Sequence, residues 1–194
     1  MVGLYAVGAA VGAGALLFAG SSSASPIGGG SDAPGSPLGG SSGDASPMPA
    51  NDPDANVDAL LSALLLAESA GDFGALVGGG STSDLSHHPA FTDASNTTRS
   101  AWKGWRNSHA AGGWQFQPQT WIECAASIGA QDFEPATQKA GAIYLLQRRG
   151  ALADVRAGDL PAALYKLRAE WQSVPVRGNA WFIAHYTDNG GFLA

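Results

Sequence analysis

From residue 58 onward, apolar side chains recur at helical spacing in short segments that begin at proline or a capping residue and end at glycine. Leucines at residues 60–65 form the first stripe, with Asn56 or Asp58 as the N-terminal cap. The same pattern predicts four further helices: Pro118 to Gly129, Pro135 to Gly150, Asp159 through Trp171, and about 180 to 188. It therefore favours a mostly α-helical domain over residues 58–194.

A different composition separates the first two of these helices. Residues 73–89 are rich in glycine and serine, and Ala75–Val77 is the one short stretch there that suits a strand. We expect a small β hairpin or lobe at this point. The predicted fold class is accordingly α+β, mostly helical.

Residues 1–20 contain no charged side chain and are rich in glycine and alanine. A helix of this length would span about 30 Å, close to the hydrocarbon thickness of a bilayer. The segment is predicted to be a hydrophobic helix that serves either as a weak membrane anchor or as an export signal. Both interpretations place the rest of the chain outside the cytoplasm.

Residues 21–57 have the composition of a linker, since 22 of these 37 residues are Gly, Ser or Pro. Such a segment cannot bury enough apolar surface to offset its chain entropy. We expect a disordered tether between the N-terminal segment and the domain.

The charge of the predicted domain argues against one class of partner. All ten Lys and Arg residues lie after residue 98, and residues 58–194 carry 12 acidic and 10 basic side chains. A nearly neutral domain does not attract a phosphate backbone by bulk electrostatics. Nucleic acid is therefore not an expected partner.

Glu68 is the first candidate for chemistry, because it ends the apolar run of residues 60–67. A carboxyl group partly surrounded by apolar side chains keeps its proton near neutral pH, as a general acid must. Protonation of a glycosidic oxygen is a reaction that uses such an acid. The alternative is that Glu68 merely ends a helix at the surface.

Residues 112–116, with the sequence Gly-Gly-Trp-Gln-Phe, are the second candidate. Two glycines allow a backbone to approach a ligand closely, Gln115 can donate and accept hydrogen bonds, and Trp114 offers a flat face for a sugar. The alternative is a turn followed by two core aromatic residues.

Seven short motifs occur in a fixed order. They are Glu68-Ser69, Val77-Gly78-Gly79, Asp84-x-Ser86-x-His88-Pro89, Gly112-x-x-Gln115, Asp132-Phe133-x-Pro135 with Gln138, Arg149-Gly150-Ala151-Leu152 and Trp171-x-Ser173-x-Pro175. This series resembles the phage lambda endolysin family of lysozyme-like lytic transglycosylases. Residues 91–109 depart from the family pattern, and Gly113-Trp114 replaces a basic residue followed by tyrosine.

The resemblance implies a lysozyme-like fold and a mechanism. Glu68 would protonate the oxygen between N-acetylmuramic acid and N-acetylglucosamine and then take a proton from the muramic acid 6-hydroxyl, which leaves a 1,6-anhydro product. The implied partner is the glycan strand of peptidoglycan, and neither a metal nor another cofactor is needed. The expected substrate-binding residues are Ser69, Trp114, Gln115, Phe116 and Trp171.

Two alternatives to this mechanism stay open. A hydrolytic lysozyme would need a second carboxylate, for which Asp72, Asp84 and Asp93 are candidates. In the other common phage lysozyme family an aspartate lies nine residues after the glutamate, where this chain has Val77. A non-catalytic role is the other alternative, as a glycan-binding structural protein of a virion or an envelope machine.

The biological setting follows from the N-terminal segment. We expect a periplasmic or membrane-anchored protein that faces the cell wall, held at the bacterial inner membrane through residues 1–20 or carried in a virion or envelope assembly. An endolysin, a virion-associated enzyme and a cellular enzyme all suit this plan.

A zinc amidase or a cysteine peptidase is a weaker hypothesis, suggested by His87, His88, His109 and Cys124. Adjacent histidines do not readily ligate one ion, and no further ligand follows at metal-site spacing. Cys124 lies on the apolar side of its predicted helix, which favours a buried side chain over a nucleophile.

Overall fold

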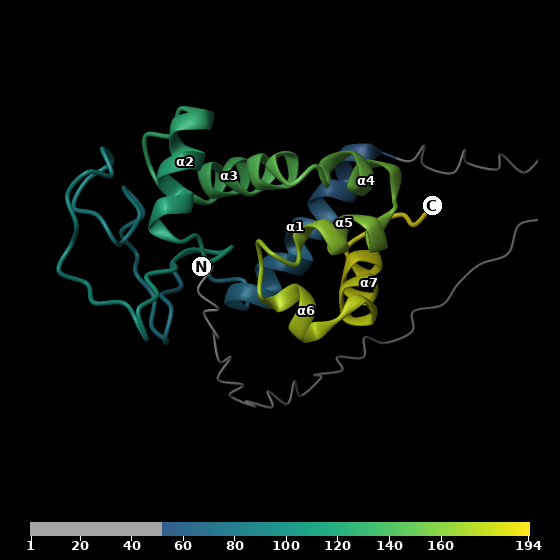
Figure 1. Ribbon diagram of the computed structural model, residues 1–194, viewed down its shortest axis with the longest axis horizontal. Coiled ribbons are helices and arrows are strands. Elements are labelled where there is room, and N and C mark those ends of the chain that lie inside the picture. Colours follow the sequence, from purple (N-terminus) through teal and green to yellow (C-terminus); the bar gives the residue numbers. More distant parts are fainter. Residues whose placement is uncertain (1–51) are drawn as a thin grey trace, which may run out of the picture. The chain divides into compact units, whose positions relative to one another are not determined.

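The computed structural model describes residues 52–194, and this part of the chain is mostly α-helical (Figure 1). Its helices are α1 (Pro53–Ser69), α2 (Pro118–Ile128), α3 (Pro135–Arg148), α4 (Leu152–Ala157), α5 (Leu160–Leu167), α6 (Ser173–Arg177) and α7 (Asn179–Asp188). The predicted hydrophobic helix and most of the predicted linker lie outside the described residues. Within residues 52–194, no helix combines the length and the hydropathy needed to cross a membrane.

Helix α1 begins earlier than the sequence pattern predicts. The Asp52 carboxylate accepts a hydrogen bond from the Asp54 N–H (2.9 Å), and Pro53 occupies the first helical turn. Residues 53–57 are therefore helical, and their assignment to the linker is wrong. Asn56 is not the cap, because its buried side chain bonds to Phe192 N–H (2.8 Å) at the other end of the domain.

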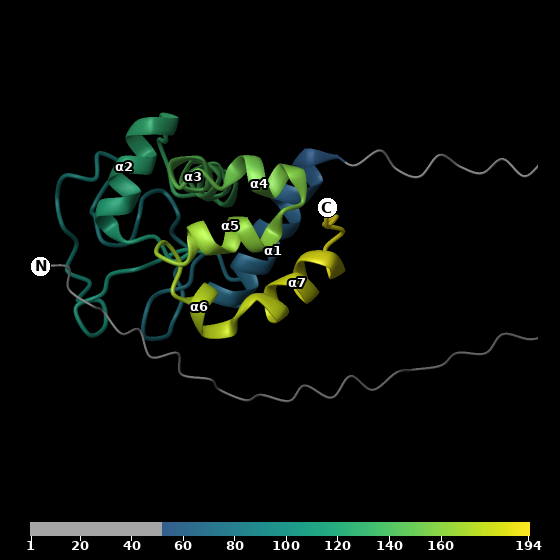
Figure 2. The same ribbon diagram turned by 45° about the vertical axis from the view of Figure 1, so that its right-hand side comes forward.

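Helix α1 runs through the middle of the domain and contacts α3, α4, α6 and α7 (Figures 1 and 2). Its predicted leucine stripe is buried, with Leu60, Leu61 and Leu64 at most 1% exposed. Each such side chain contributes about 1.5–3 kcal/mol through burial. The packing of α1 thus fixes the position of the side chains in its last turn.

The helices with clear start and stop signals agree with the predictions. Helix α2 ends at Gly129, which has the left-handed backbone conformation (φ 69°) that favours glycine. Helix α5 was expected to run through Trp171 but ends earlier, at Leu167, so Trp171 lies in the connection to α6. Helices α4 and α6 were not predicted, because they are too short to display a periodic apolar pattern.

Residues 70–117 form the lobe, which we define by this range, and they contain isolated antiparallel bridges instead of continuous strands. Ala75 pairs with Ser81, and the Leu76 N–H donates to the Gly80 carbonyl (3.0 Å), so the predicted hairpin is present. The predicted strand at 75–77 is reduced to single bridges. The helical part of the expected α+β fold is therefore confirmed. Its β part is limited to a few isolated bridges in the lobe.

Candidate active site

Glu68 occupies the last turn of α1, where the apolar stripe reaches the edge of the core. Its side chain is half-buried, and the helix stops two residues later at Ala70, which adopts a left-handed conformation (φ 55°). The Ser69 hydroxyl donates to the Leu65 carbonyl within the same helix (2.9 Å). Ser69 thus supports the helix end, and its contact with substrate stays a prediction.

The Glu68 carboxyl is held by the start of α6. Its Oε1 accepts a hydrogen bond from the Ser173 backbone N–H (3.3 Å). The Ser173 hydroxyl is also buried, but it has no hydrogen-bond partner of good geometry among the described residues. The backbone N–H is therefore the donor that the geometry supports.

Opposing effects act on the Glu68 proton. Burial raises the pKa of Glu68 above its ordinary value of 4.5, while hydrogen bonding from Ser173 and the positive charge of Arg177 lower it, with a net rise. Arg177 is kept nearby by a hydrogen bond to the Ala67 carbonyl (3.4 Å) and by stacking on Trp181 (4.3 Å). Burial thus favours the protonated form of Glu68, and Ser173 and Arg177 stabilise its anion.

The predicted turn at residues 112–116 packs across the end of α1. Gly112 and Gln115 have positive φ angles (82° and 50°), and Ala111 and Phe116 exchange backbone hydrogen bonds to close the turn. A Cβ on Gly113 would come within 2.5 Å of Leu65 Cδ1, so a larger residue there would require the Leu65 side chain of α1 to shift.

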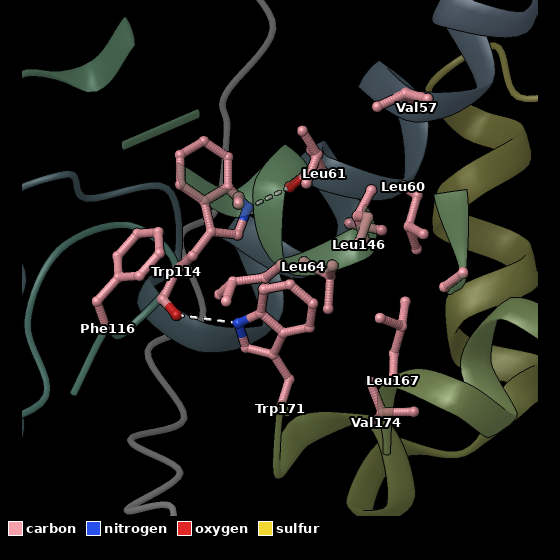
Figure 3. Close-up of a cluster of buried hydrophobic side chains, with 14 of the residues drawn as sticks. Val57, Leu60, Leu61, Leu64, Trp114, Phe116, Leu146, Leu167, Trp171 and Val174 are labelled. Carbon is pink, nitrogen blue, oxygen red and sulfur yellow. Dashed lines mark hydrogen bonds between the residues drawn. The ribbon is translucent and has the colours of Figure 1, made fainter. Parts of the chain in front are cut away.

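The aromatic residues predicted to bind sugar lie in the core instead (Figure 3). Trp114, Phe116 and Trp171 are only 3%, 2% and 3% exposed. The Trp114 indole N–H donates to the Leu61 carbonyl, and the Trp171 indole N–H donates to the Trp114 carbonyl (both 3.0 Å). The prediction that Trp114 offers a flat face to a sugar is therefore wrong, because its ring is buried in the core. Phe116 and Trp171, which were expected to bind substrate, are core side chains as well.

Gln115 is the member of the turn that keeps partial exposure. Its side-chain amide donates to the Gly112 carbonyl (2.9 Å) and the Ala75 carbonyl (3.3 Å), which ties the turn to the hairpin of the lobe. Its contact with substrate stays a prediction.

Three segments far apart in the sequence therefore meet along the C-terminal half of α1, with α6 in contact with Glu68 itself. Hydrogen bonds join α1 to the turn through Trp114, the turn to the connection before α6 through Trp171, and α6 to Glu68. The expectation that Glu68 is partly surrounded by other side chains at a helix end is confirmed, and its catalytic role stays a prediction. Such an arrangement can deliver a proton from one carboxyl group.

The other candidate carboxylates close local turns in the lobe. Asp72 accepts from the Gly74 N–H (2.8 Å), Asp84 from the Ser86 N–H (3.0 Å), and Asp93 from the Ser95 N–H (2.9 Å). All three are exposed. The serine hydrogen bonds hold the pKa values of Asp84 and Asp93 below their usual range. These two groups suit turn formation better than proton donation.

His88 has a structural role that the sequence did not reveal. It is fully buried, its Nδ1 accepts from the Ala90 N–H (3.1 Å), and its Nε2 consequently donates to the Phe116 carbonyl (2.9 Å). Burial lowers the pKa of His88 to about 4. A neutral His88 thus joins the segment around Ala90 to the turn at 112–116 within the lobe.

The described residues do not support the metal and thiol hypotheses. Residues 52–194 contain no group of three or more side chains that could hold a metal ion. Cys124 is buried as predicted, and burial raises the pKa of its thiol to about 12. A thiol in this state is a core side chain rather than a nucleophile.

Sequence reasoning missed the residues that hold Glu68 and the turn in place. Ser173 and Arg177 reach the end of α1 from more than a hundred positions away in the chain. Gln138 accepts from the Gly113 N–H (2.7 Å) and donates to the Phe73 and Phe133 carbonyls (2.9 and 2.8 Å). Ser173 and Gln138 both occur in the ordered motifs, which was the one available signal.

Comparisons with known proteins agree with this architecture. The family model described as Endolysin matches residues 59–189. The chain is 29% identical to the endolysin of Escherichia phage lambda over 123 residues, which cover 60% of this chain and 73% of that protein. It is 37% identical to the endolysin of Escherichia phage P2 over 71 residues, which cover 37% of this chain and 43% of that protein.

Solved structures of bacteriophage lambda lysozyme have the same fold. The lysozyme complexed with a chitohexasaccharide gives a TM-score of 0.59 at 26% identity, and a second structure of the lysozyme gives 0.58 at 23%. Each similarity covers 72% of this chain and 97% of the lysozyme. The predicted lysozyme-like fold is confirmed, and since the family match spans most of the described residues, the chain belongs to the endolysin family.

Proposed function

We propose that this endolysin is a peptidoglycan lytic transglycosylase in which Glu68 acts alone as acid and then as base. The observation that carries the proposal is the state of the Glu68 carboxyl: half-buried, with a raised pKa and with donors placed for its anion. The solved lambda lysozyme that resembles this chain holds a chitohexasaccharide, which supports a glycan strand as the substrate here.

In the first step Glu68 donates its proton to the glycosidic oxygen between N-acetylmuramic acid and N-acetylglucosamine. The bond from that oxygen to C1 of muramic acid breaks, and positive charge develops on the sugar ring. Burial raises the pKa of the Glu68 carboxyl above its ordinary value, which extends to higher pH the range in which it holds the proton that it donates.

In the second step the Glu68 carboxylate takes the proton from the 6-hydroxyl of the same muramic acid. The freed oxygen bonds to C1, which gives the 1,6-anhydro ring and restores the acid without consuming water. The Ser173 N–H and the Arg177 charge stabilise the carboxylate between the two steps.

The behaviour of the other carboxylates supports this route over hydrolysis. A hydrolytic lysozyme requires a second carboxyl group near the sugar ring, as base or nucleophile. Asp72, Asp84 and Asp93 are exposed and accept hydrogen bonds from their own turns. A mechanism in which the substrate supplies the nucleophile needs none of them.

Digestion of purified peptidoglycan in ¹⁸O-labelled water, followed by mass spectrometry of the fragments, tests the proposal. We expect unlabelled anhydro ends from the wild type. Glu68→Gln should lower the rate by about 10²–10⁴-fold, the usual contribution of a general acid. Glu134→Gln is the matched control, because Glu134 is exposed and its side chain makes no cap hydrogen bond.

Two results would contradict the proposal. Labelled reducing ends would identify a hydrolase, and equal inactivity of the wild type and Glu68→Gln would favour a non-catalytic glycan-binding protein.

We also propose that residues 1–20 bring the domain to the wall side of the inner membrane, with the residues from 21 to the start of α1 as the tether. Support comes from the uncharged, glycine- and alanine-rich composition of residues 1–20. Fractionation of cells that express the full chain or residues 21–194 tests this: only the full chain should reach the membrane or the periplasm. If the full chain and residues 21–194 distribute equally between the cell fractions, delivery by a virion or envelope assembly would be favoured.

A further inference from the structure

A hollow of about 460 Å³ lies in the lobe and is distinct from the surroundings of Glu68. It is lined by Ala90, Arg99, Ser100, Trp102, Lys103, Asn107, His109, Gln117, Pro118 and Gln119. Most of this lining comes from residues 91–109, the stretch that departs from the family pattern. The mechanism proposed above uses none of it.

The lining is cationic and contains no carboxylate. Within residues 52–194, neither Arg99 nor Lys103 has a carboxylate within ion-pair distance, although most other cations of the domain do. The paired cations are Lys139, Arg148, Arg149, Arg156 and Lys166. Arg99 and Lys103 therefore concentrate positive charge without a neutralising partner.

The walls of the hollow are ordered by internal contacts. The Arg99 guanidinium lies over the Phe91 ring (4.9 Å), and Trp102 packs edge-on against His109 (5.5 Å). The Gln117 side-chain amide donates to the Ser108 hydroxyl (2.8 Å). Because these groups are already positioned, the hollow needs little rearrangement to receive a ligand.

We propose that this hollow binds the carboxylates of the peptide stems that branch from the glycan strand. This inference rests on the proposed function, since it names the part of peptidoglycan that the lobe would contact. The N-acetylated sugars bear no charge, whereas the stem peptides carry carboxylates. A guanidinium, an ammonium group and the amides of Asn107 and Gln119 together match carboxylate chemistry.

The test compares two substrates and two charge-matched variants. Arg99→Gln/Lys103→Gln removes the proposed contacts, and Arg106→Gln/Arg168→Gln removes the same charge from exposed side chains that stack on Trp105 and Tyr165. We expect the first variant to lose about tenfold in kcat/KM on glycan strands with intact peptides. On the same strands with their peptide carboxylates amidated, the first variant should match the wild type, and the control variant should match the wild type on both substrates.

Equal losses on both substrates, or equal losses in both variants, would overturn the proposal. Binding is measured separately in the Glu68→Gln protein, with N-acetylmuramyl tetrapeptide, the same compound with its carboxylates amidated, and inorganic phosphate as probes. Only the free-carboxylate peptide should bind, and Arg99→Gln/Lys103→Gln should weaken it about tenfold. Equal binding of the amidated peptide, or stronger binding of phosphate, would contradict carboxylate recognition.

The binding measurement also separates this inference from the proposed function. If the wild type cleaves neither substrate, the transglycosylase assignment fails, and the binding of the tetrapeptide still decides the role of the hollow. Circular dichroism of each variant identifies any loss of folding.

Discussion

The helical part of the domain and its lobe are stabilised by different means. Residues 53–69 and 118–194 are mostly helical and pack apolar stripes against one another, with the leucines of α1 in the middle (Figure 3). The lobe, residues 70–117, contains only isolated bridges between its backbone segments. Side chains such as His88 and Gln138 satisfy further backbone groups that these bridges leave unpaired.

The difference shows where each part is vulnerable. Apolar packing is distributed over many contacts, so the loss of one side chain leaves the rest in place. A buried polar side chain that satisfies several backbone groups has no substitute, because each orphaned group costs about 1–3 kcal/mol. Glu68 lies two residues before the lobe begins, and the contacts that hold its carboxyl come from α6.

Gln138→Leu should have the largest effect on stability. Leucine is similar in size but leaves the Gly113 N–H and the carbonyls of Phe73 and Phe133 without their partner. We expect a loss of about 4 kcal/mol in the free energy of unfolding. Urea denaturation measures it, with Gln147→Leu on the exposed side of α3 as control. A loss below that of a core leucine would show that these polar contacts do not dominate the lobe.

Leu64→Ala tests the helical part and should destabilise by about 3 kcal/mol, through lost burial and the cavity left behind. The side chain is 0% exposed in the centre of α1. Hydrogen exchange should show that the helices and the lobe both lose protection, since α1 supports both. Selective loss in the lobe alone would contradict the division described above.

His88 makes the stability of the lobe dependent on pH. Its folded-state pKa of about 4 lies below the ordinary 6.5, so the unfolded chain binds the proton first as the pH falls. The stabilisation is complete above pH 6.5 and is lost progressively toward pH 4. Between pH 7 and pH 5 we expect the free energy of unfolding to fall by about 2 kcal/mol.

This measurement is best made in a Glu68→Gln background, because the raised pKa of Glu68 contributes a slope of opposite sign. His88→Asn should remove the pH dependence, whereas His87→Asn should retain it. A retained slope in His88→Asn would assign the effect to another group.

The same contrast explains how much of the fold could be predicted from the sequence. Proline starts and glycine stops predicted α2 and α3 closely, because these signals act within the helix itself. The start of α1 was placed too late, since Asn56 is a good cap in isolation but bonds to Phe192 across the domain. The pairings of the lobe join residues up to about forty positions apart, and no local pattern specifies them.

The candidate site shows the same division. Glu68 could be predicted as a candidate, because a carboxylate follows an apolar run and the ordered motifs begin with it. Trp114 and Trp171 could not be placed, because an aromatic residue beside glycines has the same local sequence whether it faces a sugar or the core. Only the tertiary structure shows that both rings are buried. There the Trp114 indole donates to the Leu61 carbonyl, and the Trp171 indole donates to the Trp114 carbonyl.

The most direct test of the account is the titration of the Glu68 carboxyl, followed by ¹³C NMR of the side-chain carboxyl in the free protein. The packing of α1, the turn at 112–116 and the start of α6 predict a pKa above 4.5, because desolvation outweighs the Ser173 hydrogen bond and the Arg177 charge. A titration midpoint at or below 4.5 would contradict a buried acid at this position.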